Sequence, residues 1–493
     1  MAMILIDGFD KYGAPNTNNA NVVNLMLGEW NVGSQVFIAA GLSSVGNAVN
    51  LSSSGASMGR SFANTGRIIG GVRINPSSGF AISFGDLGSM QCTICAAGGL
   101  ISLRNGTTNG TILASSASSF PNGVIHFIEW DITIGASANY QVWVDGTSIF
   151  SGTGNTRATA NNYVNNINFL FTPVGVSGAS VYDDLYLFDN TGSVNNAVLL
   201  TSPRVETTFP VSDSSVQFAI GASVIGSPIA RTSTNITFVA NVLYLRPLTA
   251  ARAMTLNTIY VMPSGTSPSA NWRMVVYADN SGLPGALLGQ SNAAVGITSG
   301  TVMVGNLITP VSLTSGVQYW LGFMCDTASI NFLMQDTLNQ GRSATATFTV
   351  GAPSSAPAMA ANSTATVWGA VTLTAPVNFY EVNQQPPASQ YSYVYDSVVG
   401  HEDLYNFGAL SVIPTAVYAV SVKSFAAKSD TGVRTMSNRL LSGGVDSGGS
   451  LTGQTLSQSF QWYGTNFDTD PGTSAAWTGV GLNAAQSGFR IDS

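Results

Sequence analysis

Short runs of β-branched and aromatic residues recur along the chain, separated by clusters of Gly, Asn, Ser and Pro. This pattern is typical of sandwich strands. Helical periodicity is rare, and its best candidate is the segment ANVVNLMLGEW at 20–30. The pattern therefore predicts an all-β protein, and 493 residues are too many for one sandwich, so we expect multiple antiparallel β-sandwich or jelly-roll domains. The clearest strand candidates are the runs at 72–85, 139–150, 236–245, 271–278 and 318–325.

Charged residues are scarce, at 8% of the chain, whereas a soluble domain usually carries about 25%. Lysine occurs only at Lys11, Lys423 and Lys428, and the net charge is −7. A nucleic-acid partner is not expected, because phosphate binding needs clustered cations. A neutral surface of Gly, Ser, Thr and Asn favours packing against other copies, since no unpaired ion has to be desolvated.

The sequence predicts neither membrane insertion nor a secretory signal. It has no run of 18 apolar residues, and the opening MAMILIDGFD lacks a cationic region, so we expect synthesis in the cytoplasm. Three cysteines are too few for a disulfide scaffold, and a lone CxxC is a weak zinc signal. We expect Cys92, Cys95 and Cys325 to be buried free thiols, and no cofactor is predicted.

Candidate catalytic groups are few. His126 and His401 are the two histidines, too few for a multi-histidine metal site, and His126 lies in an apolar run that favours a structural role. Glu129 and Asp131 follow the first two positions of a glycosidase Glu-x-Asp-x-Glu strand, but Thr133 replaces the required acid/base. We therefore predict that the chain is not an enzyme and assign no catalytic residue.

Two groups of oxygen ligands suit Ca²⁺, but neither has a full ligand set, so hydrogen bonds to turns are favoured and no metal site is assigned. They are Asp183, Asp184 and Asp189, and Asn466, Asp468 and Asp470. For glycan stacking, Trp143 shares a strand face with Gln141 and Asp145, whereas Trp320 reads most simply as core. The sequence assigns no ligand-binding residue.

Three segments of residues 1–205 form a pattern: the opening at 5–10, the hairpin at 140–150 with its Asp145-Gly146 turn, and the closing strand at 181–189. In this order they resemble the laminin-G or concanavalin-like jelly roll. It implies a sandwich in which the first and last strands pair.

Six motifs stand in the rest of the chain: RVETTFP at 204–210, YSYV at 391–394, DLY at 403–405, AAKSD at 426–430, DPG at 470–472 and AWT at 476–478. Together they resemble a family of tailed-bacteriophage virion proteins, in a split form. The resemblance implies a second β domain made of 206–227 plus 377–493, interrupted by an inserted module at 228–376. Within the insert, the runs VYADNSGLPG at 276–285 and VSLTSGVQYWLGF at 311–323 resemble an extracellular β-sandwich module that often acts as an adhesive appendage.

The resemblance implies a non-enzymatic structural protein on the surface of a virion, as a capsid decoration, head fibre or tail fibre component. Its partners would be copies of itself and other virion proteins. Two alternatives stay open: an adhesin that binds a host receptor or surface glycan, and, less favoured, a polysaccharide depolymerase.

Overall fold

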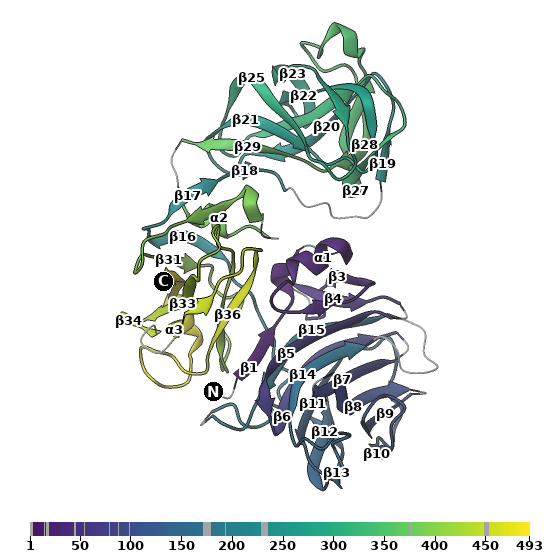
Figure 1. Ribbon diagram of the computed structural model, residues 1–493, viewed down its shortest axis with the longest axis vertical. Coiled ribbons are helices and arrows are strands. Elements are labelled where there is room, and N and C mark those ends of the chain that lie inside the picture. Colours follow the sequence, from purple (N-terminus) through teal and green to yellow (C-terminus); the bar gives the residue numbers. More distant parts are fainter. Residues whose placement is uncertain are drawn as a thin grey trace. The chain divides into compact units, whose positions relative to one another are not determined.

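The computed structural model describes the chain except for residues 1–2, 14, 16–18, 44–45, 54, 78, 87, 98, 171–178, 193, 228–234, 375–376, 386, 388 and 448–452. It forms two compact units (Figure 1): unit 1 is Met1–Gln217 with Ser397–Ser493, and unit 2 is Phe218–Asp396. The predicted three-domain division stays a prediction, and its boundaries at 228 and 376 lie outside the described residues. The strands confirm the all-β class. Of the helices described, none is long and apolar enough to cross a membrane.

Unit 1 begins with a jelly-roll sandwich of two antiparallel sheets. The larger sheet has the order β13-β12-β11-β6-β15-β4-β3, with β1 paired to β15, so the first and last strands of the jelly roll are neighbours. Its strands are β1 (Met3–Asp7), β3 (Val36–Ala40), β4 (Asn47–Leu51), β6 (Arg67–Pro76), β11 (His126–Thr133), β12 (Ala138–Val144), β13 (Thr147–Gly154) and β15 (Ser180–Phe188). The facing sheet, ordered β10-β9-β8-β7-β14-β5-β2, contains β2 (Asn31–Val32), β5 (Ser57–Thr65), β7 (Phe80–Asp86), β8 (Ser89–Ala97), β9 (Leu100–Asn105), β10 (Ile112–Ser115) and β14 (Val164–Leu170).

Aromatic residues from both sheets fill the space between them. The ring centroids of Phe84 in β7 and Trp130 in β11 lie 5.4 Å apart. Gly70 makes room for Trp130, because a Cβ at Gly70 would come within 2.8 Å of the indole. At the predicted hairpin turn, Asp145 and Gly146 both have positive φ, at 50° and 75°, as a type I′ turn requires. The predicted helix is present as α1 (Asn19–Leu25), preceded by the 3₁₀ turn η1 (Asp10–Tyr12).

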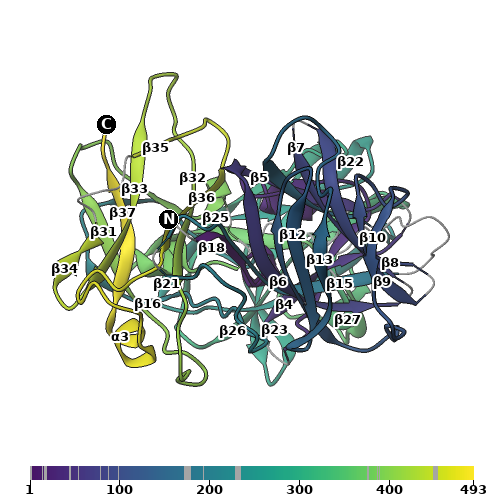
Figure 2. The same ribbon diagram turned by 90° about the horizontal axis from the view of Figure 1, so that it is seen from below.

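The C-terminal part of unit 1 is a second set of strands (Figure 2). A six-stranded sheet contains β16 (Pro210–Ser215), β31 (Glu402–Phe407), β37 (Gln486–Ile491), β33 (Thr435–Ser442), β34 (Val445–Asp446) and β35 (Gln454–Thr455). β16 pairs with β31, so the chain returns after residue 396 to the sheet it left before residue 218. A hairpin of β32 (Val420–Ala426) and β36 (Gln461–Phe467) and the short helix α3 (Gly479–Ala484) complete this part. In Figure 1, β36 runs beside β1 from the opposite end of the chain.

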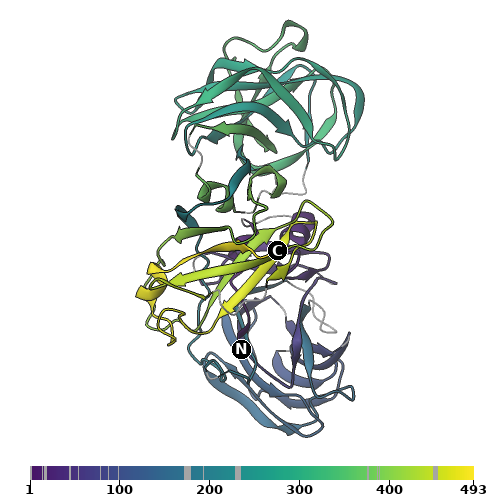
Figure 3. The same ribbon diagram turned by 60° about the vertical axis from the view of Figure 1, so that its left-hand side comes forward.

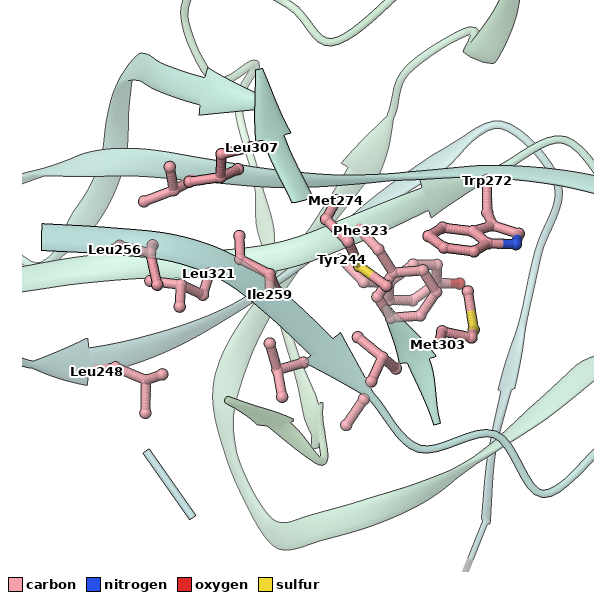
Figure 4. Packing of buried hydrophobic residues seen from close by; sticks show 14 of the residues in the cluster. Tyr244, Leu248, Leu256, Ile259, Trp272, Met274, Met303, Leu307, Leu321 and Phe323 are labelled. Atoms are coloured by element: carbon pink, nitrogen blue, oxygen red, sulfur yellow. The ribbon is translucent and has the colours of Figure 1, made fainter. Parts of the chain in front are cut away.

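Unit 2 is a separate β-sandwich. One sheet joins β18 (Val224–Ile225), β29 (Val367–Leu373), β21 (Met254–Val261) and β25 (Met303–Leu313). The other contains β19 (Asn235–Phe238), β20 (Val242–Thr249), β22 (Ser267–Asn280), β23 (Leu283–Gln290), β24 (Ala294–Ile297), β26 (Gln318–Cys325), β27 (Ile330–Thr345) and β28 (Ala360–Ala365). Smaller elements are β17 (Ala219–Ala222), β30 (Tyr393–Tyr395), α2 (Phe379–Val382), η2 (Phe348–Val350) and η3 (Ser389–Tyr391). Figure 4 shows the core, where Phe323 packs among Tyr244, Met274 and other buried residues.

Candidate functional site

Five ionisable side chains lie together in the interior of unit 1, and we call them the ion cluster. They come from distant parts of the sequence: Asp7 ends β1, Lys11 lies in η1, Glu29 precedes β2, Arg60 lies in β5 and Lys423 lies in β32. Alternation along β1 buries Met3, Leu5 and Asp7 on one face. Phe9 then adopts the left-handed region, with φ of 59°, and the chain turns so that Lys11 comes back over Asp7.

Both carboxylates of the ion cluster contact cations. Lys11 Nζ lies 2.9 Å from Asp7 Oδ1 and 2.9 Å from Glu29 Oε2. Lys423 Nζ lies 2.7 Å from Glu29 Oε1 and 3.9 Å from Asp7 Oδ2. Arg60 Nη1 is 3.3 Å from Glu29 Oε1. The Asp7 and Glu29 side chains are each 1% exposed, so solvent screens these contacts little.

Neutral donors complete the surroundings of Asp7. The Tyr12 hydroxyl donates to Asp7 Oδ2 at 2.7 Å and also contacts Glu29 Oε2. Trp30 Nε1 donates to Asp7 Oδ2 at 2.9 Å, and the backbone N–H of Phe9 donates to Oδ1 at 2.9 Å. Asp7 is thus hydrogen-bonded among aromatic side chains.

Three cations face two anions in the ion cluster, and this excess affects Lys423. Burial lowers the pKa of Lys423 to about 8 against the attraction of Asp7 and Glu29, and Lys11 and Arg60 lower it further. Burial also opposes ionisation of Glu29, but Lys11, Lys423 and Arg60 hold its pKa well below the usual range. The ion cluster therefore contains one lysine with a lowered pKa beside a carboxylate that stays ionised.

Further polar contacts join the same N-terminal and C-terminal segments. The ribbons of these segments, yellow and purple, lie beside each other in Figure 3. Trp462 Nε1 donates to the carbonyl of Leu25 at 2.6 Å. Asn466 Nδ2 donates to the carbonyl of Ile4 at 3.1 Å, and Asp468 Oδ1 accepts from the N–H of Met3 at 3.2 Å. Asp470 instead accepts from the N–H of Gly472 at 2.8 Å. These three predicted oxygen ligands thus make separate hydrogen bonds.

The other predicted oxygen ligands also bind the chain itself. Asp183 accepts from the N–H groups of Leu42 and Asp184, both at 2.8 Å. Asp184 pairs with Arg73 at 2.7 Å and accepts from the N–H of Val205 at 2.8 Å. Asp189 accepts from the N–H of Thr191 at 2.8 Å. Within the described residues, no group of three or more acidic, His or Cys side chains is arranged to hold a metal.

The Asp183→Asn variant should lose less stability with rising pH than the native chain. Burial raises the pKa of Asp183 to about 7, with Asp184 and Asp10 adding to the effect. In the unfolded chain this carboxyl titrates near about pH 4. Because its pKa is higher in the folded state, the protonated carboxyl stabilises the fold below about pH 4, and this stabilisation is lost as pH rises through about 7. Urea unfolding measures the effect. Between about pH 5 and about pH 8, the free energy of unfolding of the variant should fall by about 2 kcal/mol less than that of the native chain. Asp189→Asn, in the turn after β15, is the control. If the free energy of unfolding changes with pH by the same amount in all three proteins, the expectation is wrong.

The glycosidase-like residues do not line an open site. Glu129 is fully buried and accepts from the Tyr186 hydroxyl at 2.5 Å and from the N–H groups of Leu199 and Leu200 at 3.1 and 2.9 Å. Its carboxylate fixes the segment that follows β15. On the same strand, Asp131 pairs with Arg67 at 2.7 Å. Thr133 accepts through its carbonyl from the Thr156 hydroxyl at 2.6 Å.

The two histidines lie apart from these carboxylates. His126 Nδ1 is 2.7 Å from Asp145 Oδ2, and its ring packs on Phe120 at 4.5 Å between centroids. His401 follows the turn at 399–400, and its N–H donates to the carbonyl of Val398 at 3.2 Å.

The three cysteines and Trp320 are buried, as the sequence predicted. Cys92, Cys95 and Cys325 are buried free thiols, and burial raises the pKa of Cys92 to about 12. Trp320 is buried and donates to Asp279 at 2.7 Å, which confirms its place in the core. Trp143 is half-buried on β12.

Sequence reasoning missed the ion cluster, although a signal for it existed. The chain has three lysines, and two of them, Lys11 and Lys423, belong to the cluster. Scarcity of lysine indicated a neutral surface. With so few lysines on the surface, each remaining lysine was a candidate for an internal ion pair, but the sequence analysis did not consider this.

Comparison with known proteins gave no family. No family model and no curated protein matches the chain. Among solved structures, the alginate lyase Aly36B in complex with alginate tetrasaccharide aligns at a TM-score of 0.29 and 15% identity, covering 38% of this chain and 97% of the lyase. The endo-β-1,4-glucuronan lyase of Trichoderma reesei aligns at 0.26 and 11%, covering 33% and 91%. A tetrameric galectin from Cinachyrella sp. aligns at 0.22 and 15%, covering 27% and 99%. Likenesses this weak say nothing about a ligand or substrate of this chain.

Proposed function

We propose that the chain is a non-enzymatic structural protein on the surface of a tailed-phage virion, where it acts by multivalent assembly as a capsid decoration, head fibre or tail fibre component. The motifs at 204–210, 391–394 and 470–472 support the virion context. Many copies on a symmetric particle would turn weak contacts into stable attachment. Its partners are copies of itself and other virion proteins.

One observation supports the assembly role: part of the small number of charged residues is internal. At least twelve of the 41 are buried, so the surface is poorer in charge than the composition alone indicates. Such a surface loses little free energy of hydration when it packs against another protein. The twelve are Asp7, Asp10, Lys11, Glu29, Asp86, Glu129, Asp183, Asp184, Glu381, Asp403, Arg439 and Asp470.

A small exposed apolar patch on unit 1 is suited to contact between copies. It consists of Val412, Ile413, Pro414 and Val480 of the loop before β32 and the start of α3. Val412, Ile413 and Val480 are 69%, 60% and 68% exposed. The two segments touch, because a Cβ at Gly479 would lie 2.8 Å from Ile413 and 2.9 Å from Pro414. Clustered exposed apolar residues of this kind mark interaction sites.

The double variant Ile413→Ser and Val480→Ser should assemble less than the native chain, because it removes the apolar surface of the patch. Light scattering behind size-exclusion chromatography should show a lower molar mass at equal concentration. Val433→Ser is the matched control. Val433 is 73% exposed, but it lies just before the start of β33 and belongs to neither segment of the patch. If the native chain is monomeric throughout the concentration series, or all three proteins behave alike, this patch has no role in assembly.

The virion role itself is tested on particles. Antibody labelling in electron microscopy should place the protein on the outside of intact capsids or tails, and purified particles should contain it in many copies. Its absence from purified particles would refute the proposal.

A second candidate function is binding of a host receptor or surface glycan. The half-buried Trp143 favours it, since it lies on β12 near Gln141, whose amide donates to Ser148 at 2.9 Å. Aromatic faces beside amides are suited to stacking on sugars. A glycan array would show binding that Trp143→Ala abolishes, and no binding by the native chain would exclude this candidate.

A further inference from the structure

We propose that the side of unit 2 formed by β23 and β25 binds the same side of a second copy of the chain. We call its exposed residues, Leu288 with Ile308, Thr309 and Pro310, the neutral edge. The neutral edge is distinct from the apolar patch of unit 1, and its test does not depend on the virion role. Its basis is the charge, the exposure and the strand register of this part of unit 2.

The segment that supplies both strands has no charge. The 46 residues at 280–325 include no Asp, Glu, Lys, Arg or His. The same segment contains six of the 24 large apolar residues that are exposed among the described residues, which is a quarter of them in less than a tenth of the chain. Exposed apolar side chains are therefore concentrated in this segment, and a concentration of this kind marks a site of contact.

Two β-bulges push the neutral edge outward. β23 is the last strand of one sheet and β25 is the last strand of the other, and the two lie side by side (Figure 1). In β25, the four residues 307–310 lie opposite the single residue Asn257 of β21. In β23, Leu288 is the extra residue between Leu287 and Gly289, both of which pair with β22. Bulges bend an edge strand and redirect its side chains, so both strands project at this place.

The two bulges touch, so the neutral edge is one surface. A Cβ at Gly289 would lie 2.8 Å from Val311 Cγ2 and 3.6 Å from the carbonyl oxygen of Thr309. Glycine at this position therefore allows the close approach of β23 to β25. On either side of this contact, Leu288 is 40% exposed and Ile308 is 61% exposed.

The lack of charge favours a second copy as the partner. A partner that placed an ion against the neutral edge would lose hydration without gaining an ion pair, whereas two copies place neutral side chains against each other. Lipid surfaces attract proteins through clustered Lys and Arg, and the segment 280–325 has neither. Because bulged strands do not extend a regular ladder, the contact is made by side chains across a two-fold axis. The neutral edge is small, so each contact is weak and matters where many copies are held together.

Disulfide trapping in the full chain tests the contact. A two-fold contact through so small a surface brings the two thiols of an Ile308→Cys pair together, so mild oxidation should give covalent dimers many times faster than random collision. Val239→Cys measures the collision rate, because Val239 is 58% exposed but follows β19, at the opposite end of the sheet that ends with β23. The native cysteines are buried, so the native chain should give no covalent dimer. Equal rates in the two variants would overturn the proposal.

Added charges distinguish a specific contact from a thiol that is merely reactive. Leu288→Asp in the Ile308→Cys chain places like charges on both copies and should lower the rate of trapping to that of Val239→Cys. Val239→Asp in the same chain adds an equal charge away from the neutral edge and should leave trapping fast. Fast trapping in the Leu288→Asp chain would contradict the proposal. If the native chain binds phosphatidylcholine vesicles and Leu288→Asp abolishes that binding, the neutral edge binds lipid and the proposal is wrong.

Discussion

Replacing Glu29 by Ala should lower the free energy of unfolding of unit 1 by about 3–5 kcal/mol, because it leaves buried cations without their partner. Lys11, Lys423 and Arg60 all contact Glu29, so one substitution removes three ion pairs at once. Chemical denaturation followed by tryptophan fluorescence would measure the change, because Trp30 and Trp462 lie beside the cluster.

The control for this prediction is an ion pair at the surface. Asp430 and Arg434 are 2.7 Å apart, but their side chains are 46% and 52% exposed, so Asp430→Ala should leave stability unchanged within error. The double variant Glu29→Gln and Lys423→Met should lose less than the sum of its single variants, because neither ion is then left alone. A loss in Glu29→Ala no larger than that in Asp430→Ala would mean that the ion cluster adds no stability.

The sequence pattern was sufficient to predict the fold class, because a strand with one buried face alternates apolar and polar residues. The runs at 72–85 and 318–325 and the type I′ turn at Asp145-Gly146 are local signals, and the structure has strands and a turn at these places. The helix at 20–30 was found for the same reason, although α1 ends at Leu25. Gly28, with φ of 86°, follows the end of α1 within the predicted segment.

The ion cluster could not be predicted because its parts are far apart in the sequence. Asp7 and Lys11 are close enough to suggest a pair, but nothing local indicates that Lys423 approaches from β32. The carboxylates that the sequence did select have ordinary roles: Glu129 holds the backbone of Leu199 and Leu200. Spacing alone does not distinguish a carboxylate that faces solvent from one that binds its own backbone.

Phe323→Ala should lower the free energy of unfolding of unit 2 by about 3–5 kcal/mol, since it leaves a large cavity in a closely packed core. Phe323 (Figure 4) lies in β26 and is fully buried. Its ring centroid is 4.7 Å from those of Phe238 and Phe332. Val239→Ala is the matched control, because Val239 is 58% exposed and next to Phe238 in sequence, and it should leave stability nearly unchanged.

The same variant tests whether the two units unfold separately. β16 pairs with β31 within unit 1, so the ends of unit 2 leave and rejoin one sheet, as domain insertion requires. We therefore expect two transitions in calorimetry, of which Phe323→Ala lowers only one and Glu29→Ala only the other. If Phe323→Ala lowers both transitions by the same amount, the chain unfolds as one cooperative body. Unit 2 would then contribute to the stability of unit 1.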